Sequence, residues 1–372
     1  MAAPVEPPVV YHHGSHTKLL RPLSPHVDRP AGVNAIVVPT ARPHSYLTEV
    51  VDVAARLNSQ LVLLCSRWAD AGRAVEVARR HDVRAVAVDI NPFVTRLPQF
   101  QTTGMLKGTR FEQKTDLSLK RNVGLAVAHM VGWGHVLFLD DDIKVDSVAD
   151  VRDAAALADS FAAVGLTNVG FPDNSVVCHA YRLVGGIQGQ FVGAGAMVVP
   201  GRRCTSFFPT IYNEDWFFLL NDEGRLSPVT ATGKVDQKFY EPFRDPERAR
   251  GEEFGDCLAE GVFALLDDGK RVRDAVSEQY WRQYLGVRQQ FIRDILDKVP
   301  CAGLAKAEEQ RIEAALKGAR GRLAHITPQL CVQYLDALYG DRKRWQQFLK
   351  RLPRKQSAAD ALRYLGLTPH TS

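Results

Sequence analysis

The 372-residue sequence contains no apolar run that approaches the roughly 18–20 residues needed to cross a membrane. Its first 20 residues lack a basic segment followed by an apolar run of about 7–15 residues, so we expect no signal peptide. The six cysteines form no C-x-x-C pair and no zinc-like spacing. We therefore expect reduced, mostly buried thiols in a soluble, cytoplasmic protein.

Neither sign of charge dominates the sequence. Lys and Arg number 47 against 42 Asp and Glu, for a formal net charge of +5. This weak, dispersed positive balance does not indicate nucleic-acid binding, whereas it suits an enzyme with anionic substrates. The 45% of hydrophobic residues is enough for a core, and the length predicts two domains or one large domain with an appendage.

The first 30 residues are rich in Pro and His and show little periodicity, so we expect a flexible N-terminal arm over residues 1–30. His12, His13 and His16 lie in this arm. We interpret them as part of a solvated tail, with metal binding as the alternative.

From Val33 onward, short apolar runs alternate with helical patterns. This alternation implies right-handed crossovers and an α/β fold with a mostly parallel sheet covered by helices. Residues 91–115 look like a long irregular loop of the kind that often closes over a ligand. Strands are expected at 34–39, 60–65, 83–88 and 135–139, and helices at 47–57, 69–81 and 116–131.

The second half of the sequence has a different pattern. Residues 164–169, 175–183 and 191–199 are β-like and predict hairpins beside the parallel sheet. From about residue 265 the pattern is helical to the end. We therefore expect a catalytic domain over residues 31–265 and a helical C-terminal domain over residues 266–372.

An acidic cluster, Asp140-Asp141-Asp142, follows the apolar run 135–139. Ligands of open α/β sheets bind at the carboxyl ends of strands, and alternate residues of an extended segment point the same way. Asp140 and Asp142 can therefore face one site and share a hard divalent cation, Mg²⁺ or Mn²⁺, together with substrate phosphates. A solvated acidic turn is the alternative.

A second acidic pair, Glu214-Asp215, follows the Gly-rich segment 191–199. Glycines allow a ligand or another backbone to approach closely, and a carboxylate held there suits general-base catalysis. A helix-capping role is the alternative. Upstream, Lys120 and Arg121 provide cations that suit a diphosphate, unless they form an exposed basic face.

Taken together, these segments resemble the GT-A glycosyltransferases, in particular the family-2-like group. The resemblance covers roughly residues 33–222. It is carried by segments in a fixed order: Val37-Val-Pro-Thr40, Arg121-Asn122-x-Gly124, Leu139-Asp140-Asp141-Asp142, Gly193-x-Gly195 and Glu214-Asp215.

The resemblance implies a GT-A fold and a metal-dependent glycosyltransferase of the hexosyltransferase type, with Mn²⁺ or Mg²⁺ bound by Asp140 and Asp142. Asp215 is then the catalytic base, with Glu214 beside it. The acceptor would meet Gly193, Gly195 and Trp216. The implied donor site, for a UDP- or GDP-sugar, consists of Pro39, Thr40, Arg42, Ser66, Asp89, Lys120, Arg121, Asp140 and Asp141.

Two departures from the family pattern concern the donor and the metal. No acid follows the second strand, where the sequence is Leu64-Cys-Ser-Arg67, and Asp89 is a partial substitute at best. No histidine occurs between His179 and His325, so the further metal ligand is an acid, a water, a substrate oxygen or His179. Inversion by base-assisted attack is favoured over retention, which stays open.

Three other functions compete with this interpretation. A dehalogenase-type phosphotransferase needs Thr or Val where Lys144 stands, and a nucleotidyltransferase needs a G-x-G-x-R loop that Pro39-Thr-Ala-Arg-Pro43 lacks. A non-catalytic nucleotide-sugar-binding protein is the third. The acceptor, a small molecule or a lipid, and the oligomeric state cannot be read from the sequence.

The basic segment 341–355 carries interleaved apolar residues, including Trp345 and Leu349. Peripheral contact with an anionic membrane is one interpretation of this pattern. Packing of an amphipathic helix on the catalytic domain is the other, and we favour it.

Overall fold

The computed structural model describes residues 12–23, 31–91, 96–172 and 174–372. Much of the predicted N-terminal arm, residues 1–11 and 24–30, lies outside the described residues, as do residues 92–95 of the predicted loop. Two compact units form. The helical unit holds the described residues within 1–18, 174–190 and 241–336, and the sheet unit holds those within 19–173, 191–240 and 337–372. The domain boundaries predicted at residues 30 and 265 remain a proposal.

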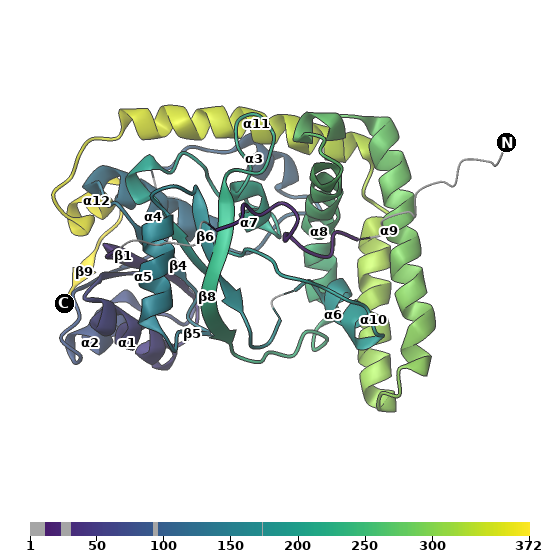
Figure 1. Cartoon of the computed structure of the whole chain (residues 1–372), viewed down its shortest axis with the longest axis horizontal. Coiled ribbons are helices and arrows are strands. Elements are labelled where there is room, and N and C mark those ends of the chain that lie inside the picture. Colours follow the sequence, from purple (N-terminus) through teal and green to yellow (C-terminus); the bar gives the residue numbers. More distant parts are fainter. Residues whose placement is uncertain (1–11, 24–30, 92–95, 173) are drawn as a thin grey trace. The chain divides into compact units, whose positions relative to one another are not determined.

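The sheet unit is built on a nine-stranded sheet in the order β5-β8-β6-β7-β4-β1-β2-β3-β9 (Figure 1). Pairs β1–β2, β1–β4, β2–β3 and β6–β8 are parallel, and the other neighbouring pairs are antiparallel. The strands are β1 (Ala35–Thr40), β2 (Gln60–Cys65), β3 (Ala85–Asp89), β4 (Val136–Leu139), β5 (Ile143–Lys144), β6 (Ala163–Asn168), β7 (Ala196–Val199), β8 (Val229–Gln237) and β9 (His370–Thr371).

Helices of the sheet unit mostly follow the strands as the sequence predicts. They are α1 (Thr48–Leu57), α2 (Ala71–Arg79), α3 (Gln101–Leu106), α4 (Leu117–Val131), α5 (Val148–Leu157), α7 (Glu214–Phe218) and α12 (Ala358–Tyr364). Among them α3 is a correction, because it lies inside the stretch 91–115 that we expect to be irregular. Its first backbone N–H groups at residues 101 and 102 donate to the buried carboxylate of Asp341, a partner that no local pattern reveals.

The α/β class and the first four strands are confirmed, whereas the expectation of a mostly parallel sheet is wrong. The sheet is mixed because β7 runs antiparallel to both of its neighbours, β4 and β6, and because β9 adds an antiparallel edge to β3. The chain is therefore not helical to its end. Strands β1 and β4 are buried over their whole length, as their continuous apolar sequences predict.

A close approach between helix α4 and strand β1 positions the residues that follow. A Cβ added to Gly124 would lie 2.6 Å from Cγ1 of Val37, so only glycine allows α4 to lie this near the strand. Gly132 ends α4 in the left-handed conformation, with φ of 83°. Arg121 and Lys120, one turn before Gly124, are thereby carried to the carboxyl edge of the sheet.

The helical unit contains α6 (Val176–Leu183), α8 (Pro246–Asp267), α9 (Glu278–Lys298) and α10 (Lys306–Leu323). Residues 175–183 are thus a helix rather than the expected strand. Ser175 caps it, since its hydroxyl accepts a hydrogen bond from the backbone N–H of Cys178, and this outweighs the β-branched pair at its start.

Residues 12–18 of the predicted N-terminal arm belong to the helical unit. His13 and His16 are 1% and 0% exposed, and Nδ1 of His13 lies 2.6 Å from the carboxylate of Asp267. The expected solvated tail is therefore wrong for these residues. The histidine rings pack on Phe263, an interaction that sequence periodicity does not report.

Helix α11 (Pro328–Arg351) contributes residues to both units. Trp345 and Leu349 of the basic segment are 0% and 3% exposed, which is the packing that we favour over membrane contact. None of the described helices combines the length and apolar character that a membrane crossing requires.

Candidate functional site

Three parallel strands of the sheet unit bring their carboxyl ends to one edge, and most of the predicted residues lie there. Strands β1, β2 and β4 end at Thr40, Cys65 and Leu139. The register pairs Val37 with Phe138, so Thr40 comes level with Asp141. The Thr40 hydroxyl accordingly donates a hydrogen bond of 2.5 Å to the Asp141 carboxylate.

Asp141, the middle residue of the acidic cluster, turns inward. It is 3% exposed, and burial raises its pKa against the opposing effect of its Thr40 and Arg42 contacts. The Arg42 guanidinium donates to Asp141 and, over 2.8 Å, to Asp142. Asp141 therefore anchors the turn after β1, while Asp142 and Asp140 have side chains that are 15% and 27% exposed.

Lys120 is buried beneath the same turn. It is 2% exposed, and its Nζ donates to the backbone oxygen of Thr40 over 2.8 Å and to the hydroxyl of Ser66 over 2.7 Å. Burial lowers the pKa of Lys120, while an ion pair with Asp116 at 3.0 Å opposes that effect. Lys120 and Ser66 thus hold together the loops after β1 and β2. Lys120 is therefore not part of an exposed basic face.

Arg121 joins the two predicted acidic clusters. One nitrogen of its guanidinium lies 3.0 and 3.1 Å from the two carboxylate oxygens of Asp140, and another donates to Glu214. Arg121 is 3% exposed and its guanidinium lies 5.6 Å from the ring centre of Phe208. Burial raises the pKa of Asp140 to about 6, although Arg121 lowers it. Segments far apart in the sequence therefore share one buried charge network.

Asp215 is held beside this network by backbone donors. Its Oδ2 accepts from the N–H of Ala194 over 3.0 Å, and its Oδ1 accepts from the N–H of Trp216 over 3.0 Å. A Cβ on Gly193 would lie 3.2 Å from Oδ2 of Asp215. Burial raises the pKa of Asp215, with Arg121 opposing. The carboxylate is thus fixed in orientation and is more basic than an ordinary aspartate.

The glycine segment also contacts the first acidic cluster. The Asp140 backbone N–H donates to the backbone oxygen of Gly195 over 2.8 Å, and a Cβ on Gly195 would lie 3.4 Å from Oδ2 of Asp140. Residues 193–195 therefore run between Asp140 and Asp215. The predicted function of these glycines as acceptor contacts stays a prediction, and the structure adds that they fit between two carboxylates.

Three of the predicted residues have other surroundings. Pro39 lies within β1 opposite Leu64. Asp89 accepts from the N–H of Ala71 over 3.0 Å at the start of α2. Trp216 is 8% exposed, and its ring stacks on Phe191 with the ring centres 5.2 Å apart. Their assignments to donor and acceptor binding stay predictions.

Two exposed aromatic residues lie at this edge, and sequence reasoning missed one of them, Trp68. Trp68, in the turn after β2, is 76% exposed, and its backbone N–H donates to the backbone oxygen of Ala41 over 3.3 Å. Phe239 is 74% exposed and follows Lys238, whose N–H donates to the backbone oxygen of Asp142 over 3.0 Å. An aromatic residue just after a strand that ends at the ligand edge is the signal that could have identified Trp68.

The acidic side chains suit a hard divalent cation. Asp140 and Asp142 supply carboxylate oxygens, which are the ligands that Mg²⁺ and Mn²⁺ prefer. Each already contacts a positively charged group, Arg121 at Asp140 and Arg42 at Asp142. Both carboxylates thus already stabilise a positive charge, and their oxygens are suitable ligands for a divalent cation.

His179, one of the open options for a further ligand, belongs to the helical unit. Burial lowers its pKa to about 3, and neighbouring arginines add to the effect, so the imidazole is neutral at ordinary pH. Its function as a ligand stays a prediction.

No family model and no curated protein matches this chain. Several solved structures are similar to it, among them the following two. The mannosyltransferase PcManGT from Pyrobaculum calidifontis, in complex with GDP-Man and Mn²⁺, is 16% identical with a TM-score of 0.45, and the match covers 88% of this chain and 92% of the other. A mycobacterial protein is 16% identical with a TM-score of 0.41, with 64% and 76% covered. Similarity at this level assigns no activity to the chain.

Proposed function

We propose that the chain is a glycosyltransferase that moves a sugar from a nucleoside-diphosphate donor to an acceptor hydroxyl at the carboxyl edge of the sheet. The observation that carries the proposal is the network of Asp140, Arg121, Glu214 and Asp215, which unites two acidic clusters and the glycine segment at one place. Such a network places the groups for two functions next to each other. One function is to bind the cation that a diphosphate needs, and the other is to accept a proton from a hydroxyl.

Asp215 is the proposed base. Its two backbone hydrogen bonds, each of 3.0 Å, fix the carboxylate, and its raised pKa makes it a stronger proton acceptor. Glu214, paired with Arg121, positions the helix start that carries Asp215. The attacking hydroxyl would give its proton to Asp215 as its oxygen bonds to the anomeric carbon, and the diphosphate would leave with the electron pair of the broken bond.

Asp142 and Asp140 are the proposed ligands of Mn²⁺ or Mg²⁺. When bound, the cation would neutralise negative charge on the departing diphosphate. Asp141, Thr40 and Lys120 act on the protein itself, because they hold the turn between β1 and α1 against the end of β4. Arg42, half-exposed on that turn, is the residue best placed to turn from Asp142 toward a phosphate.

The first experiment is calorimetric titration with UDP-, GDP- and dTDP-sugars, each with Mn²⁺ and with EDTA. We expect one nucleotide class to bind, and binding to be lost with EDTA and in Asp142→Ala. The control is Asp146→Ala, because Asp146 is an acid four residues away with a side chain that is 71% exposed. Binding that is unchanged in EDTA and in Asp142→Ala would contradict the metal site.

The second experiment separates catalysis from mere binding. Asp215→Asn keeps the size of the side chain but removes the base, so we expect the transfer rate to fall by about 10²–10⁴-fold with donor affinity unchanged. Glu223→Gln, on an exposed loop, is the matched control. Full activity of Asp215→Asn would refute the base assignment. Donor binding without transfer in the unaltered protein would favour a non-catalytic binding protein.

A further inference from the structure

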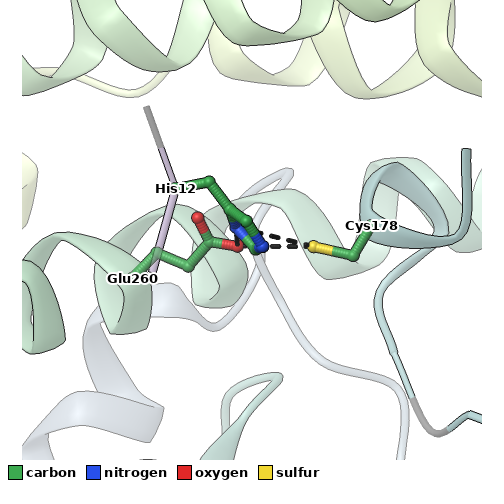
Figure 2. Close-up of side chains that lie close together, drawn as sticks. All are labelled: His12, Cys178 and Glu260. Carbon is green, nitrogen blue, oxygen red and sulfur yellow. Dashed lines mark hydrogen bonds and ion pairs between the residues drawn. The ribbon is translucent and has the colours of Figure 1, made fainter. Parts of the chain in front are cut away.

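Three side chains of different chemical types converge within the helical unit (Figure 2). His12, Cys178 and Glu260 each offer one ligand atom, and these atoms lie within 4.8 Å of one another. Nδ1 of His12 is 2.8 Å from Oε1 of Glu260, and Sγ of Cys178 is 3.4 Å from that oxygen and 3.9 Å from Nδ1. The three atoms therefore form a small triangle around a common point.

The three residues come from separate segments of the chain. His12 belongs to the N-terminal segment, Cys178 to the first turn of α6, and Glu260 to α8. Their side chains are almost completely buried: those of His12 and Glu260 are 6% and 1% exposed, and Cys178 is 3% exposed. A chance meeting of exposed groups is thus excluded, because the fold itself brings the three atoms together away from solvent.

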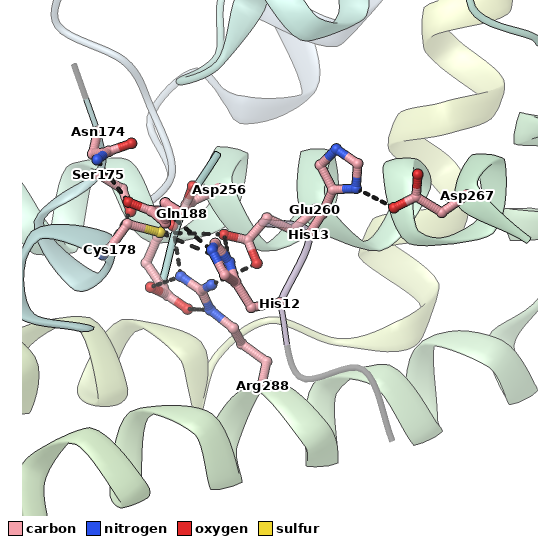
Figure 3. Close-up of polar contacts among 11 residues, drawn as sticks. His12, His13, Asn174, Ser175, Cys178, Gln188, Asp256, Glu260, Asp267 and Arg288 are labelled. Atoms are coloured by element: carbon pink, nitrogen blue, oxygen red, sulfur yellow. Dashed lines mark hydrogen bonds and ion pairs between the residues drawn. The ribbon is translucent and has the colours of Figure 1, made fainter. Parts of the chain in front are cut away.

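A buried cluster of ion pairs borders the triangle. Arg288, fully buried, forms an ion pair with Glu253 at 3.0 Å. It also forms ion pairs with Asp256 at 2.7 Å and with Glu260 at 3.2 Å, both of which are labelled in Figure 3. One guanidinium thus faces three buried carboxylates. Arg288 belongs to α9 and the three carboxylates belong to α8, so these ion pairs fix the Glu260 carboxylate in place beside His12 and Cys178.

The dimensions of the triangle suit zinc. Zinc binds nitrogen and oxygen at about 2.0–2.2 Å and thiolate sulfur at about 2.3 Å, usually with tetrahedral geometry. These bond lengths place nitrogen and oxygen about 3.4 Å apart and sulfur about 3.6 Å from either of them. The observed 2.8, 3.4 and 3.9 Å differ from those values by about 0.6 Å or less, which rotations of the side chains supply.

The imidazole of His12 also has a neighbour on its other nitrogen. The amide nitrogen of Gln188 lies 3.1 Å from Nε2 of His12, and the amide oxygen of Gln188 accepts from the Asn174 amide over 2.7 Å. A histidine that binds metal through one nitrogen carries its proton on the other and normally donates it to a second group. Rotation of the Gln188 amide by half a turn, together with that of the Asn174 amide, presents the Gln188 oxygen to that proton and keeps a hydrogen bond between the two amides. Gln188 is thereby placed to fix the ring for binding through Nδ1.

We propose that His12, Cys178 and Glu260 bind a zinc ion that fastens the N-terminal segment to α6 and α8. Thiolate and imidazole ligands select zinc over Mg²⁺ or Ca²⁺, which prefer oxygen. The three protein ligands leave one position of a tetrahedron for water. The binding site is independent of Asp140 and Asp142, and it stands or falls separately from the proposed transferase activity.

The test uses the full-length protein, purified without a histidine tag and dialysed against a chelator. We expect one zinc ion to bind per chain on titration. Replacement by Co²⁺ should give the near-ultraviolet charge-transfer absorption of a thiolate ligand, which a carboxylate site cannot produce. Absence of this absorption in the unaltered protein would overturn the proposal without the need for any variant.

Variants then assign the ligands. Cys178→Ala should abolish the charge-transfer absorption, and His12→Gln should weaken zinc binding by at least about tenfold, since even residues that only orient a ligand cost about 10–100-fold. Cys257→Ala is the matched control, because it removes another fully buried thiol from the same unit. Asp142→Ala should also keep the absorption. Absorption that persists in Cys178→Ala, or equal loss in Cys257→Ala, would refute the assignment.

Discussion

Replacing Arg121 tests whether the buried charge network is as interdependent as its geometry indicates. Arg121→Met keeps most of the side-chain length but leaves Asp140 and Glu214 without their guanidinium. Arg121 is 3% exposed, and the Glu214 side chain is 10% exposed, so water replaces little of the lost interaction. Removing one partner of a buried ion pair costs about 3–5 kcal/mol, and we expect the free energy of unfolding to fall by that amount.

The measurement is urea unfolding in EDTA at pH 8 and at pH 5. Burial already raises the pKa of Asp140 to about 6, and loss of Arg121 removes an opposing effect. A carboxyl whose pKa is higher in the folded than in the unfolded protein favours folding at low pH, and this contribution is lost as the pH rises through the folded-state pKa. The destabilisation should therefore be smaller at pH 5 than at pH 8.

Two further variants complete this experiment. Adding Glu214→Gln to Arg121→Met removes one of the uncompensated charges and should restore part of the stability. Arg79→Met, which disrupts an exposed pair with Glu76, should leave the urea midpoint unchanged. A loss below about 1 kcal/mol in Arg121→Met would be the value for a surface pair and would refute the buried network.

The remaining predictions concern packing, pH and a helix start. Gly124→Ala should destabilise the protein by about 1–3 kcal/mol in urea unfolding, because its Cβ would lie 2.6 Å from Val37, and adding Val37→Ala should recover part of this loss. His179, whose pKa burial lowers to about 3, favours folding only when neutral, so stability is lost as the pH falls below about 6.5. His179→Gln should remove about 2 kcal/mol of the fall in the free energy of unfolding between pH 7 and pH 5. An unchanged dependence of the free energy of unfolding on pH would contradict this. Asp341→Ala should cost about 1–3 kcal/mol and speed hydrogen exchange at Thr102, whose N–H donates to Asp341 over 2.8 Å.

Local patterns were sufficient for the first half of the fold. The apolar runs that became β1, β2, β3 and β4 are continuous and are separated by clear helical periodicity, so their parallel pairing could be predicted. The later strands could not. Whether β7 pairs antiparallel with β4 depends on where the chain returns after α6, and no residue in the segment 191–199 encodes that path.

The same distinction holds for the candidate site. The sequence placed Asp140 and Asp142 after a strand, and the register of β1 with β4 then brings Asp141 to Thr40. The link from Arg121 to Glu214 spans 93 positions, and a single sequence carries no sign of it. The prediction of a solvated tail is wrong for His12 for a similar reason, because its partners on α6 and α8 lie far away along the chain.

The two arginines of the site differ in a way that bears on how a cation would bind. The Arg42 side chain is 42% exposed, and Asp142, which it contacts, has a side chain that is 15% exposed. Arg121 is buried, sits above Phe208 and joins Asp140 to Glu214 at once. Moving Arg42 into water breaks contacts to two carboxylates and restores its hydration, whereas moving Arg121 would leave buried charges unpaired on both sides. A cation bound as proposed should therefore displace Arg42 and not Arg121, and we expect Asp142 to be the carboxylate that changes its partner.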